Sequence, residues 1–292
     1  MKKTNRILVL LLLLVLLLLL VLVLLLITNN TNIFTKISED NLLVLTYDTD
    51  ISNTNVQNLV KLLDKNKYKY KILGNNEEWN GWYGRLNSYI KFMQTLNPDT
   101  YIILCDARDV LINQDSTSFI SKASKEYKDK LILSSEPNCC SRLDGPYKDN
   151  YISAKNKEMN IENALSIYIN YMKSMALKKS GQDYYYSLNF GLQFGKVKDF
   201  LKVFKLMNIK PEQDDQSLVY KIFYEYPDLV ELDYNNILFS NVHTAQINFS
   251  EDFSWDDVNK SWIATKTGNT PAFIQTPAKY WDAYYLLLEK LL

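Results

Sequence analysis

The sequence has few residues that could cross-link or chelate. It contains three cysteines and a single histidine among 292 residues, with none of the spacings of a zinc site. The cysteines are Cys105, Cys139 and Cys140, an odd number. We therefore expect a fold that does not depend on disulfides, with Cys105 as a buried free thiol at a strand end, although its pairing with one of the other two stays open.

The chain also lacks an excess of charge of either sign. Its 33 Lys and Arg residues equal its 33 Asp and Glu residues, so the formal net charge at pH 7 is zero. Without a broad basic field there is little to attract a polyanion, and nucleic acid is not an expected partner. Internal repeats are missing too, and low complexity is confined to the N-terminus.

The N-terminus is a long apolar run without charge. From residue 7 to residue 27 nearly every position is Leu, Val or Ile. A helix of this length, at about 1.5 Å per residue, spans the roughly 30 Å hydrocarbon core of a bilayer. A cleavable signal peptide is the competing interpretation, but its apolar region usually has only about 7 to 15 residues. We therefore predict an uncleaved membrane anchor.

The charges beside the anchor predict its orientation. Lys2, Lys3 and Arg6 precede the run, and basic residues stay on the cytoplasmic side. The expected protein is a single-pass type II membrane protein of the endoplasmic reticulum or Golgi, with a lumenal domain. Its expected parts are a cytoplasmic tail (1–6), the anchor (7–27), a stem (28–40) and one domain (41–292).

Behind the stem, apolar strands alternate with amphipathic helices. In the first half, strands are expected at 41–48, 68–73, 100–105 and 130–136, and helices at 56–66, 85–96 and 116–127. In the second half, strands are expected at 186–195 and 229–233, and helices at 162–177, 197–207, 214–226 and 277–292. Such alternation predicts an α/β fold of the nucleotide-binding type, a mostly parallel sheet with flanking helices.

One of the predicted strands ends in two acids. Asp106 and Asp109 follow the apolar segment 100–105, and ligands of parallel α/β sheets bind outside the carboxyl ends of the strands. Two carboxylates three residues apart in a tight turn can converge on one divalent cation, which can neutralise a diphosphate leaving group. An equally weighted alternative is structural: Asp106 caps the turn, and Asp109 pairs with Arg108 or a lysine.

Six segments, taken in order, carry a family resemblance. They are ILGNNEEWNGWYGR (72–85), SSEPNCC (134–140), YYSLNFGLQFG (185–195), EQDDQSLVY (212–220), VELDYNNILF (230–239) and NTPAFIQTPAKY (269–280). Their succession resembles the glycosyltransferase domain of the procollagen lysyl hydroxylase (PLOD) family and, more distantly, the collagen galactosyltransferases. The resemblance covers about residues 42–285. It implies a GT-A-like, Rossmann-type fold, a UDP-sugar as donor and Mn²⁺ as cofactor.

The resemblance also implies roles for single residues near the diphosphate. Asp106 and Asp109 would be metal ligands, and Trp79 would lie beside the uracil or ribose; an equally weighted alternative for Trp79 is a tryptophan of the core. Asn189 would hydrogen-bond the sugar, and Gly191 would let the backbone approach it. Lys279 joins the residues expected to bind the donor.

Two further acids match carboxylates that face the donor sugar in the family. Asp214 and Asp215 are adjacent at a predicted helix start, so we expect one to face the site and the other to cap the helix. We favour Asp215 as the acid in the site. Either acid could orient the acceptor hydroxyl or stabilise the positive charge that builds at the anomeric carbon.

The sequence departs from the family pattern at three places. Gln275 stands where the family carries a metal-binding histidine, and an amide oxygen is a weaker ligand for Mn²⁺ than imidazole; His243 could replace it from a neighbouring loop. Arg108 stands where the family has an aromatic residue, and its guanidinium could stack on the base or contact phosphate. The acceptor-loop Cys-Trp-Pro reads Cys139-Cys140-Ser141 here, so acceptor choice is expected to differ.

The leading functional prediction is a membrane-anchored hexosyltransferase. It would move glucose or galactose from a UDP-sugar to a lumenal protein or glycan acceptor, such as hydroxylysine of a collagen-like protein, with Mn²⁺. The alternative is a catalytically degenerate GT-A-like binding or scaffold domain, and a nucleotide-sugar hydrolase is a third possibility. Because the chain ends at Leu292, we expect no iron- and oxoglutarate-dependent hydroxylase module.

Overall fold

The computed structural model describes residues 36–126, 129–137, 161–242, 249–277 and 280–292, together with Val15 and 17–19. The chain divides into two compact units, Met1–Lys36 and Ile37–Leu292, and the second unit holds the fold described below. Among the described residues no helix is both long and apolar enough to cross a bilayer. Nearly all of the predicted anchor (7–27) lies outside the described residues, so the anchor stays a prediction.

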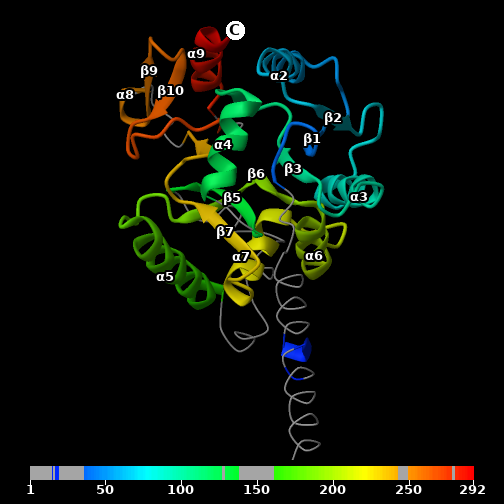
Figure 1. The fold of residues 1–292 in the computed structure, drawn as a ribbon. Coiled ribbons are helices and arrows are strands. Elements are labelled where there is room, and N and C mark those ends of the chain that lie inside the picture. The colour runs from blue at the N-terminus through cyan, green and yellow to red at the C-terminus, as the bar shows by residue number, and fades with distance from the viewer. Residues whose placement is uncertain are drawn as a thin grey trace, which may run out of the picture. The chain divides into compact units, whose positions relative to one another are not determined.

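The centre of the fold is a six-stranded mixed sheet with the strand order β2-β1-β3-β6-β5-β7 (Figure 1). Its strands are β1 (Leu42–Tyr47), β2 (Tyr70–Leu73), β3 (Tyr101–Cys105), β5 (Leu131–Glu136), β6 (Ser187–Lys196) and β7 (Val230–Asp233). Strand β1 runs parallel to β2 and β3, and β5 runs parallel to β7, whereas β6 is antiparallel to both of its neighbours. The predicted α/β sheet is present, with one antiparallel strand.

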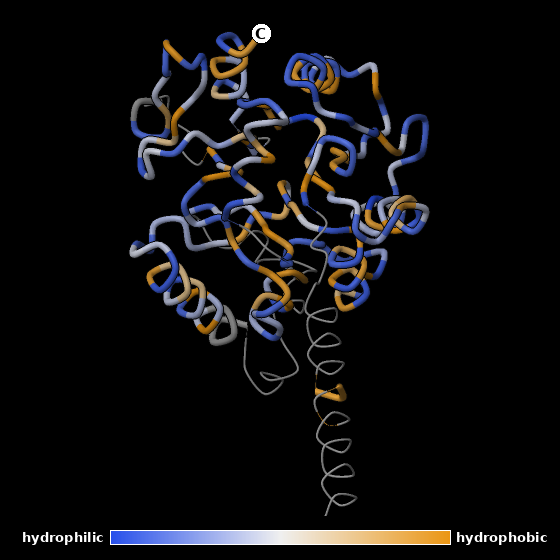
Figure 2. Tube along the Cα trace, viewed as in Figure 1, coloured by the Kyte–Doolittle hydropathy of each residue, from blue (hydrophilic) through white to orange (hydrophobic). Residues whose placement is uncertain are grey.

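Helices cover both faces of this sheet. They are α2 (Thr54–Lys65), α3 (Gly81–Met93), α4 (Ser116–Glu126), α5 (Ile161–Ser180), α6 (Val197–Met207), α7 (Asp215–Glu225), the short α8 (Phe249–Asp252) and α9 (Trp281–Leu291). The helix predicted over 85–96 begins one turn earlier, at Gly81. The helices pack against the sheet through buried apolar side chains such as Leu59 in α2 and Phe119 in α4, and Figure 2 shows apolar segments recurring along the helices.

Side-chain alternation along the strands separates two apolar cores. Val44 and Ile103 point into the core that α2, α4 and α9 share, whereas Leu45 and Leu104 point into the core beneath α3, α5, α6 and α7. This is the period of two expected for strands buried on both faces. Cys105, at the end of β3, is a buried free thiol as predicted, and burial raises its pKa.

A second, three-stranded sheet lies next to the end of β3. It consists of β4 (Val110–Ile112), β11 (Phe273–Gln275) and β8 (Phe239–Asn241), with β11 in the middle. In its register Gln275 stands opposite Val110 on one side and Asn241 on the other. Neither this sheet nor the hairpin β9 (Phe253–Asp256) and β10 (Ser261–Ala264) was predicted from the sequence. The register places Gln275 beside the residue that follows Asp109.

Candidate active site

The turn between β3 and β4 is held by backbone hydrogen bonds at both ends. The Asp106 amide donates to the Gly191 carbonyl at 2.9 Å, which extends the pairing of β3 with β6. The Thr276 amide donates to the Asp109 carbonyl at 2.8 Å. The two acids of the turn are therefore fixed against β6 on one side and against the segment after β11 on the other.

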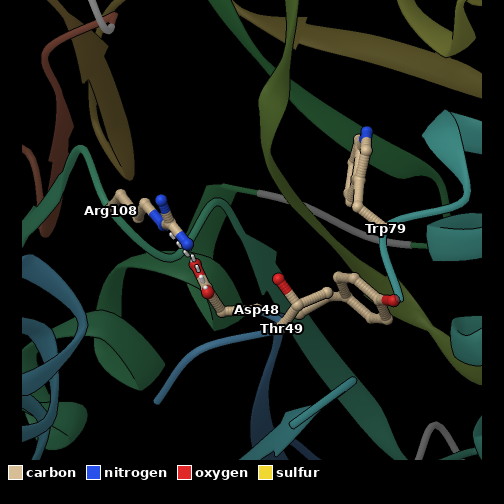
Figure 3. A pocket seen from close by; sticks show the side chains of 5 residues that line it. Asp48, Thr49, Trp79 and Arg108 are labelled. Carbon is tan, nitrogen blue, oxygen red and sulfur yellow. Dashed lines mark hydrogen bonds and ion pairs between the residues drawn. The ribbon is translucent and has the colours of Figure 1, made fainter. Parts of the chain in front are cut away.

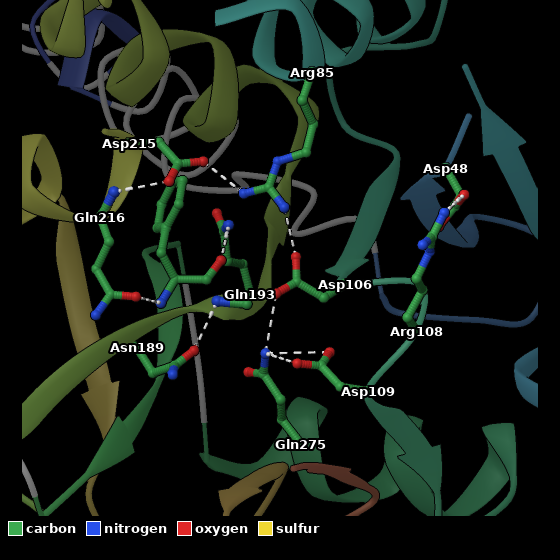
Figure 4. Close-up of polar contacts among 12 residues, drawn as sticks. Asp48, Arg85, Asp106, Arg108, Asp109, Asn189, Gln193, Asp215, Gln216 and Gln275 are labelled. Atoms are coloured by element: carbon green, nitrogen blue, oxygen red, sulfur yellow. Dashed lines mark hydrogen bonds and ion pairs between the residues drawn. The ribbon is translucent and has the colours of Figure 1, made fainter. Parts of the chain in front are cut away.

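The carboxylates of Asp106 and Asp109 converge on the side-chain amide of Gln275. Gln275 Nε2 donates to Asp106 Oδ2 at 3.0 Å and makes longer contacts of 3.5 and 3.4 Å with Asp109 Oδ1 and Oδ2 (Figure 4). Burial raises the pKa of Asp106, and burial together with the Asp106 charge raises the pKa of Asp109 to about 8. Two acids that disfavour each other's ionisation thus face one point, where positive charge would be stabilised.

Gly191 makes room for this arrangement. A Cβ atom at Gly191 would lie 2.3 Å from both Gln275 Nε2 and Gln275 Oε1. Asn189 Oδ1 accepts a hydrogen bond from the Gly191 amide at 2.8 Å, and Asn189 Nδ2 donates to Glu136 Oε2 at 3.2 Å. Both residues lie beside the acids, and their predicted contacts with the sugar stay predictions.

Arg85 joins two of the predicted site acids, although the sequence prediction gave it no role. Arg85 Nη1 donates to Asp106 Oδ1 and Arg85 Nη2 donates to Asp215 Oδ2, each at 2.6 Å. The guanidinium lies 4.6 Å from the centre of the Trp82 ring. Burial alone would lower the pKa of Arg85, but the charges of Asp215 and Asp106 outweigh it and raise the pKa. The sequence contains a signal for this role, because Arg85 lies on the buried face of α3 with Leu86, Tyr89 and Met93.

The two adjacent acids at the start of α7 point in different directions. Asp214 is the N-cap, and its Oδ2 accepts from the Ser217 amide at 2.9 Å and from the Ser217 hydroxyl at 2.8 Å. Asp215 turns toward Arg85, while its Oδ1 accepts from the Gln216 amide at 2.9 Å. Asp215, the acid favoured from the sequence, is therefore the one connected to Asp106.

A cavity of about 340 Å³ lies on the other side of the β3–β4 turn, lined by Tyr47, Asp48, Thr49, Trp79 and Arg108 (Figure 3). Arg108 makes a two-point ion pair with Asp48, with Nε 2.7 Å from Oδ2 and Nη2 2.8 Å from Oδ1. Trp79 is half exposed, and its ring is tilted against Tyr47 at 6.1 Å. Trp79 and Arg108, both predicted to bind the donor, thus line one cavity, and Asp48 rather than Asp109 is the acid that pairs with Arg108.

The candidate metal ligands are two carboxylates and one amide. In the described part of the chain no cluster of three or more His, Cys, Asp or Glu residues could hold a metal ion. Gln275 Oε1, however, is buried and has no hydrogen-bond partner, and carboxylate and amide oxygens are the ligands that hard divalent cations prefer. Asp106, Asp109 and Gln275 therefore fit such a cation. His243, Lys279, Cys139 and Cys140 lie outside the described residues.

Known proteins resemble this chain in sequence and in fold. The family model described as PLOD GT domain matches residues 38–183, half of the chain. Over 245 residues the chain is 26% identical to the multifunctional procollagen lysine hydroxylase and glycosyltransferase of Caenorhabditis elegans, a match that covers 76% of this chain and 29% of that protein. The chain thus spans less than a third of the length of this relative.

Two solved structures are similar over most of the chain. One is a glycosyltransferase involved in the glycosylation of the major capsid of PBCV-1, with a TM-score of 0.44, 13% identity and coverage of 80% of this chain and 92% of that one. The other is mouse xyloside xylosyltransferase 1 in its apo form, with a TM-score of 0.40, 10% identity and coverage of 82% and 98%.

Proposed function

Since the chain belongs to the PLOD GT domain family, we propose that it is a glycosyltransferase that moves a hexose from a UDP-sugar to an acceptor hydroxyl. The observation that carries this proposal is the fork of Arg85, which joins Asp106, at the candidate cation site, to Asp215. Asp106 follows the carboxyl end of β3, where α/β sheets bind ligands, and the Arg85 fork joins it to Asp215 at the start of α7.

The cavity beside the turn suits the nucleoside part of the donor. The half-exposed Trp79 offers a ring on which a planar base can stack, and the paired Arg108 and Asp48 offer a charged, hydrogen-bonding wall opposite it. Arg108 lies in the same four-residue turn as Asp106 and Asp109. A nucleoside in the cavity would therefore direct its diphosphate toward the two acids.

A divalent cation, Mn²⁺ in our proposal, would be held by Asp106, Asp109 and Gln275 and would neutralise the charge of the diphosphate leaving group. In the transfer itself a bond forms between the acceptor oxygen and the anomeric carbon, the bond from that carbon to the diphosphate breaks, and UDP leaves with the bonding electrons. The acceptor hydroxyl loses its proton in the same conversion, and this proton passes to an oxygen of the departing UDP or to water.

Asp215 is the acid we assign to the reacting sugar. One of its oxygens is engaged by Arg85 and the other by the Gln216 amide, and hydrogen bonds to a carboxylate weaken it as a base. Its proposed contribution is therefore a fixed negative charge close to the positive charge that develops at the anomeric carbon, rather than proton removal. Asp214, engaged as the helix cap, is proposed to act on stability alone.

The finer identity of the reaction follows the relatives and stays part of the proposal. We propose glucose or galactose as the donor hexose from the family resemblance of the sequence, and a hydroxylysine of a collagen-like protein as the acceptor, because the relative in C. elegans is named as a procollagen lysine hydroxylase and glycosyltransferase. The site of action is the lumen of the endoplasmic reticulum or Golgi, with the chain anchored through residues 7–27.

The test is UDP release by the purified full chain from UDP-glucose and UDP-galactose, with Mn²⁺ and with or without a hydroxylysine-containing collagen peptide. We expect release that the peptide stimulates and that Asp106→Asn/Asp109→Asn abolishes. Lys179→Met, which removes an exposed ion pair with Glu231, is the matched control. Release that the peptide does not stimulate would make the protein a hydrolase, and failure of the folded chain to bind UDP would leave a non-enzymatic domain.

A further inference from the structure

Gln275 is buried with its two amide atoms in opposite situations. The residue is 3% exposed. Its Nε2 lies within 3.5 Å of three carboxylate oxygens, from Asp106 and Asp109, whereas its Oε1 has no hydrogen-bond partner. Leaving a buried acceptor unpaired costs about 1 to 3 kcal/mol. The two acids therefore hold the amide in this orientation, and its carbonyl oxygen is left without a hydrogen bond.

The nitrogen of Gln275 lies where the carboxylates of Asp106 and Asp109 converge. It is the group toward which both carboxylates converge, and it brings them a partial positive charge. A rotation of the terminal amide group by about 180° exchanges Nε2 and Oε1 without moving the rest of the side chain. This is possible because the NH₂ and C=O ends of the amide are similar in size. The unpaired carbonyl oxygen would then face the space between the acids.

We propose that Gln275 substitutes for the cation when the site is empty and becomes its third protein ligand when the cation binds, so that the site is built from oxygen alone and accepts Mg²⁺ or Ca²⁺ about as readily as Mn²⁺. This inference rests on the proposed function, because it concerns the same cation. It goes further in assigning the ligand atom, its rotation and the metal preference.

Charge and geometry around the acids support three oxygen ligands. Asp106 uses Oδ1 for Arg85 and Oδ2 for Gln275, so the guanidinium does not compete for the oxygen that faces the cation. Two carboxylates match the charge of one divalent cation, and the neutral amide adds no excess. Carboxylate and carbonyl oxygens suit Mg²⁺, Ca²⁺ and Mn²⁺ alike, whereas imidazole suits transition-metal ions such as Mn²⁺ better than Mg²⁺ or Ca²⁺.

The experiment measures cation binding, not turnover. Mn²⁺ is titrated into the full chain in the presence of UDP and followed by the electron paramagnetic resonance signal of the free ion, and Mg²⁺ and Ca²⁺ are titrated in competition. For the wild type we expect dissociation constants for Mn²⁺ and Mg²⁺ within about tenfold of each other. Gln275→His should change the ratio of the two dissociation constants in favour of Mn²⁺ by about tenfold or more. Gln275→Leu should weaken the binding of both ions by about tenfold.

Each outcome decides the proposal. A wild-type preference for Mn²⁺ over Mg²⁺ of more than about tenfold, or unchanged affinities in Gln275→Leu, would overturn it while UDP binding and transfer leave the proposed function standing. If the folded wild-type chain binds neither cation nor UDP, the proposed function fails as well. If Gln275→Leu does not fold, as judged by circular dichroism, the decision rests on Gln275→His. A ratio of the dissociation constants for Mg²⁺ and Mn²⁺ that equals the wild-type ratio would then count against the proposal.

Discussion

Replacing Arg85 by methionine tests whether the acid cluster depends on one buried cation. The change removes the guanidinium that contacts Asp106 and Asp215, whose side chains are 28% and 5% exposed. Removing one partner of a buried ion pair costs about 3 to 5 kcal/mol, because the remaining charge is left uncompensated. Since solvent screens part of the Asp106 charge, we expect about 3 kcal/mol near neutral pH.

The assay is thermal unfolding of the cation-free full chain, in which a loss of that size lowers the melting temperature by roughly 6 to 12 °C. The change should depend on pH with a definite sign. Burial raises the pKa of Asp106 whereas Arg85 lowers it, so the variant has the higher pKa. The destabilisation of the variant should therefore shrink as pH falls and the carboxyl group takes up its proton.

Two controls sharpen the measurement. Arg85→Lys keeps the charge but has one nitrogen in place of the fork, so it should recover only part of the lost stability. Lys179→Met removes an ion pair whose lysine side chain is 39% exposed and should cost less than about 1 kcal/mol. The role of Arg85 as the buried cation between Asp106 and Asp215 would be refuted if Arg85→Met and Lys179→Met lost the same amount of stability. It would also be refuted if the stability lost in Arg85→Met grew as pH falls.

Four further predictions address the surroundings. Gly191→Ala should displace the Gln275 amide from its 2.3 Å overlap, costing about 1 to 3 kcal/mol and weakening cation binding in titration. The cation-free chain should lose stability as pH rises from about 4 to about 8, because the unfolded Asp109 carboxyl group is ionised over this range while the folded one keeps its proton up to its raised pKa of about 8, and added Mg²⁺ should flatten this slope in melting curves. Trp79→Ala should cost about 1 to 2 kcal/mol of stability, because the ring is half exposed but contacts Tyr47 and Trp82, while UDP binding measured by calorimetry weakens by about 1 to 3 kcal/mol. Asp214→Ala should cost about 1 kcal/mol of stability with transfer retained, whereas Asp215→Asn should lose transfer; the reverse assignment of the two effects would contradict the geometry at the start of α7.

The sequence predicts well those parts of the fold in which a periodic pattern of apolar residues continues over many positions. Strand β1, with six residues, and helix α2, with twelve, follow directly from the apolar patterns at 41–48 and 56–66. The split of Asp214 and Asp215 into a cap and a site residue also follows from local helix geometry, because adjacent side chains on a helix diverge.

The parts that the sequence could not predict depend on short strands and on pairing across the chain. Strands β4 and β11 have three residues each, too few to show alternation, and the contact of Gln275 with Asp109 exists only through their register. Asp48 and Arg108 are 60 positions apart, so their pairing depends on β1 lying next to β3. Arg85 is different: it is a charged residue on the core face of a helix, a conflict that pointed to a buried partner.

The two acids of the β3–β4 turn are not equivalent, although the motif presents them as a pair. Asp106 directs one oxygen to Arg85, and through it to Asp215, and the other oxygen to Gln275. The side-chain oxygens of Asp109 meet Gln275. Under the proposed function, a substitution at Asp106 would disturb both the proposed cation site and the proposed sugar site, so its kinetic defect would mix binding with chemistry. A substitution at Asp109 would act at the proposed cation site alone, which makes it the cleaner probe of that part of the proposal.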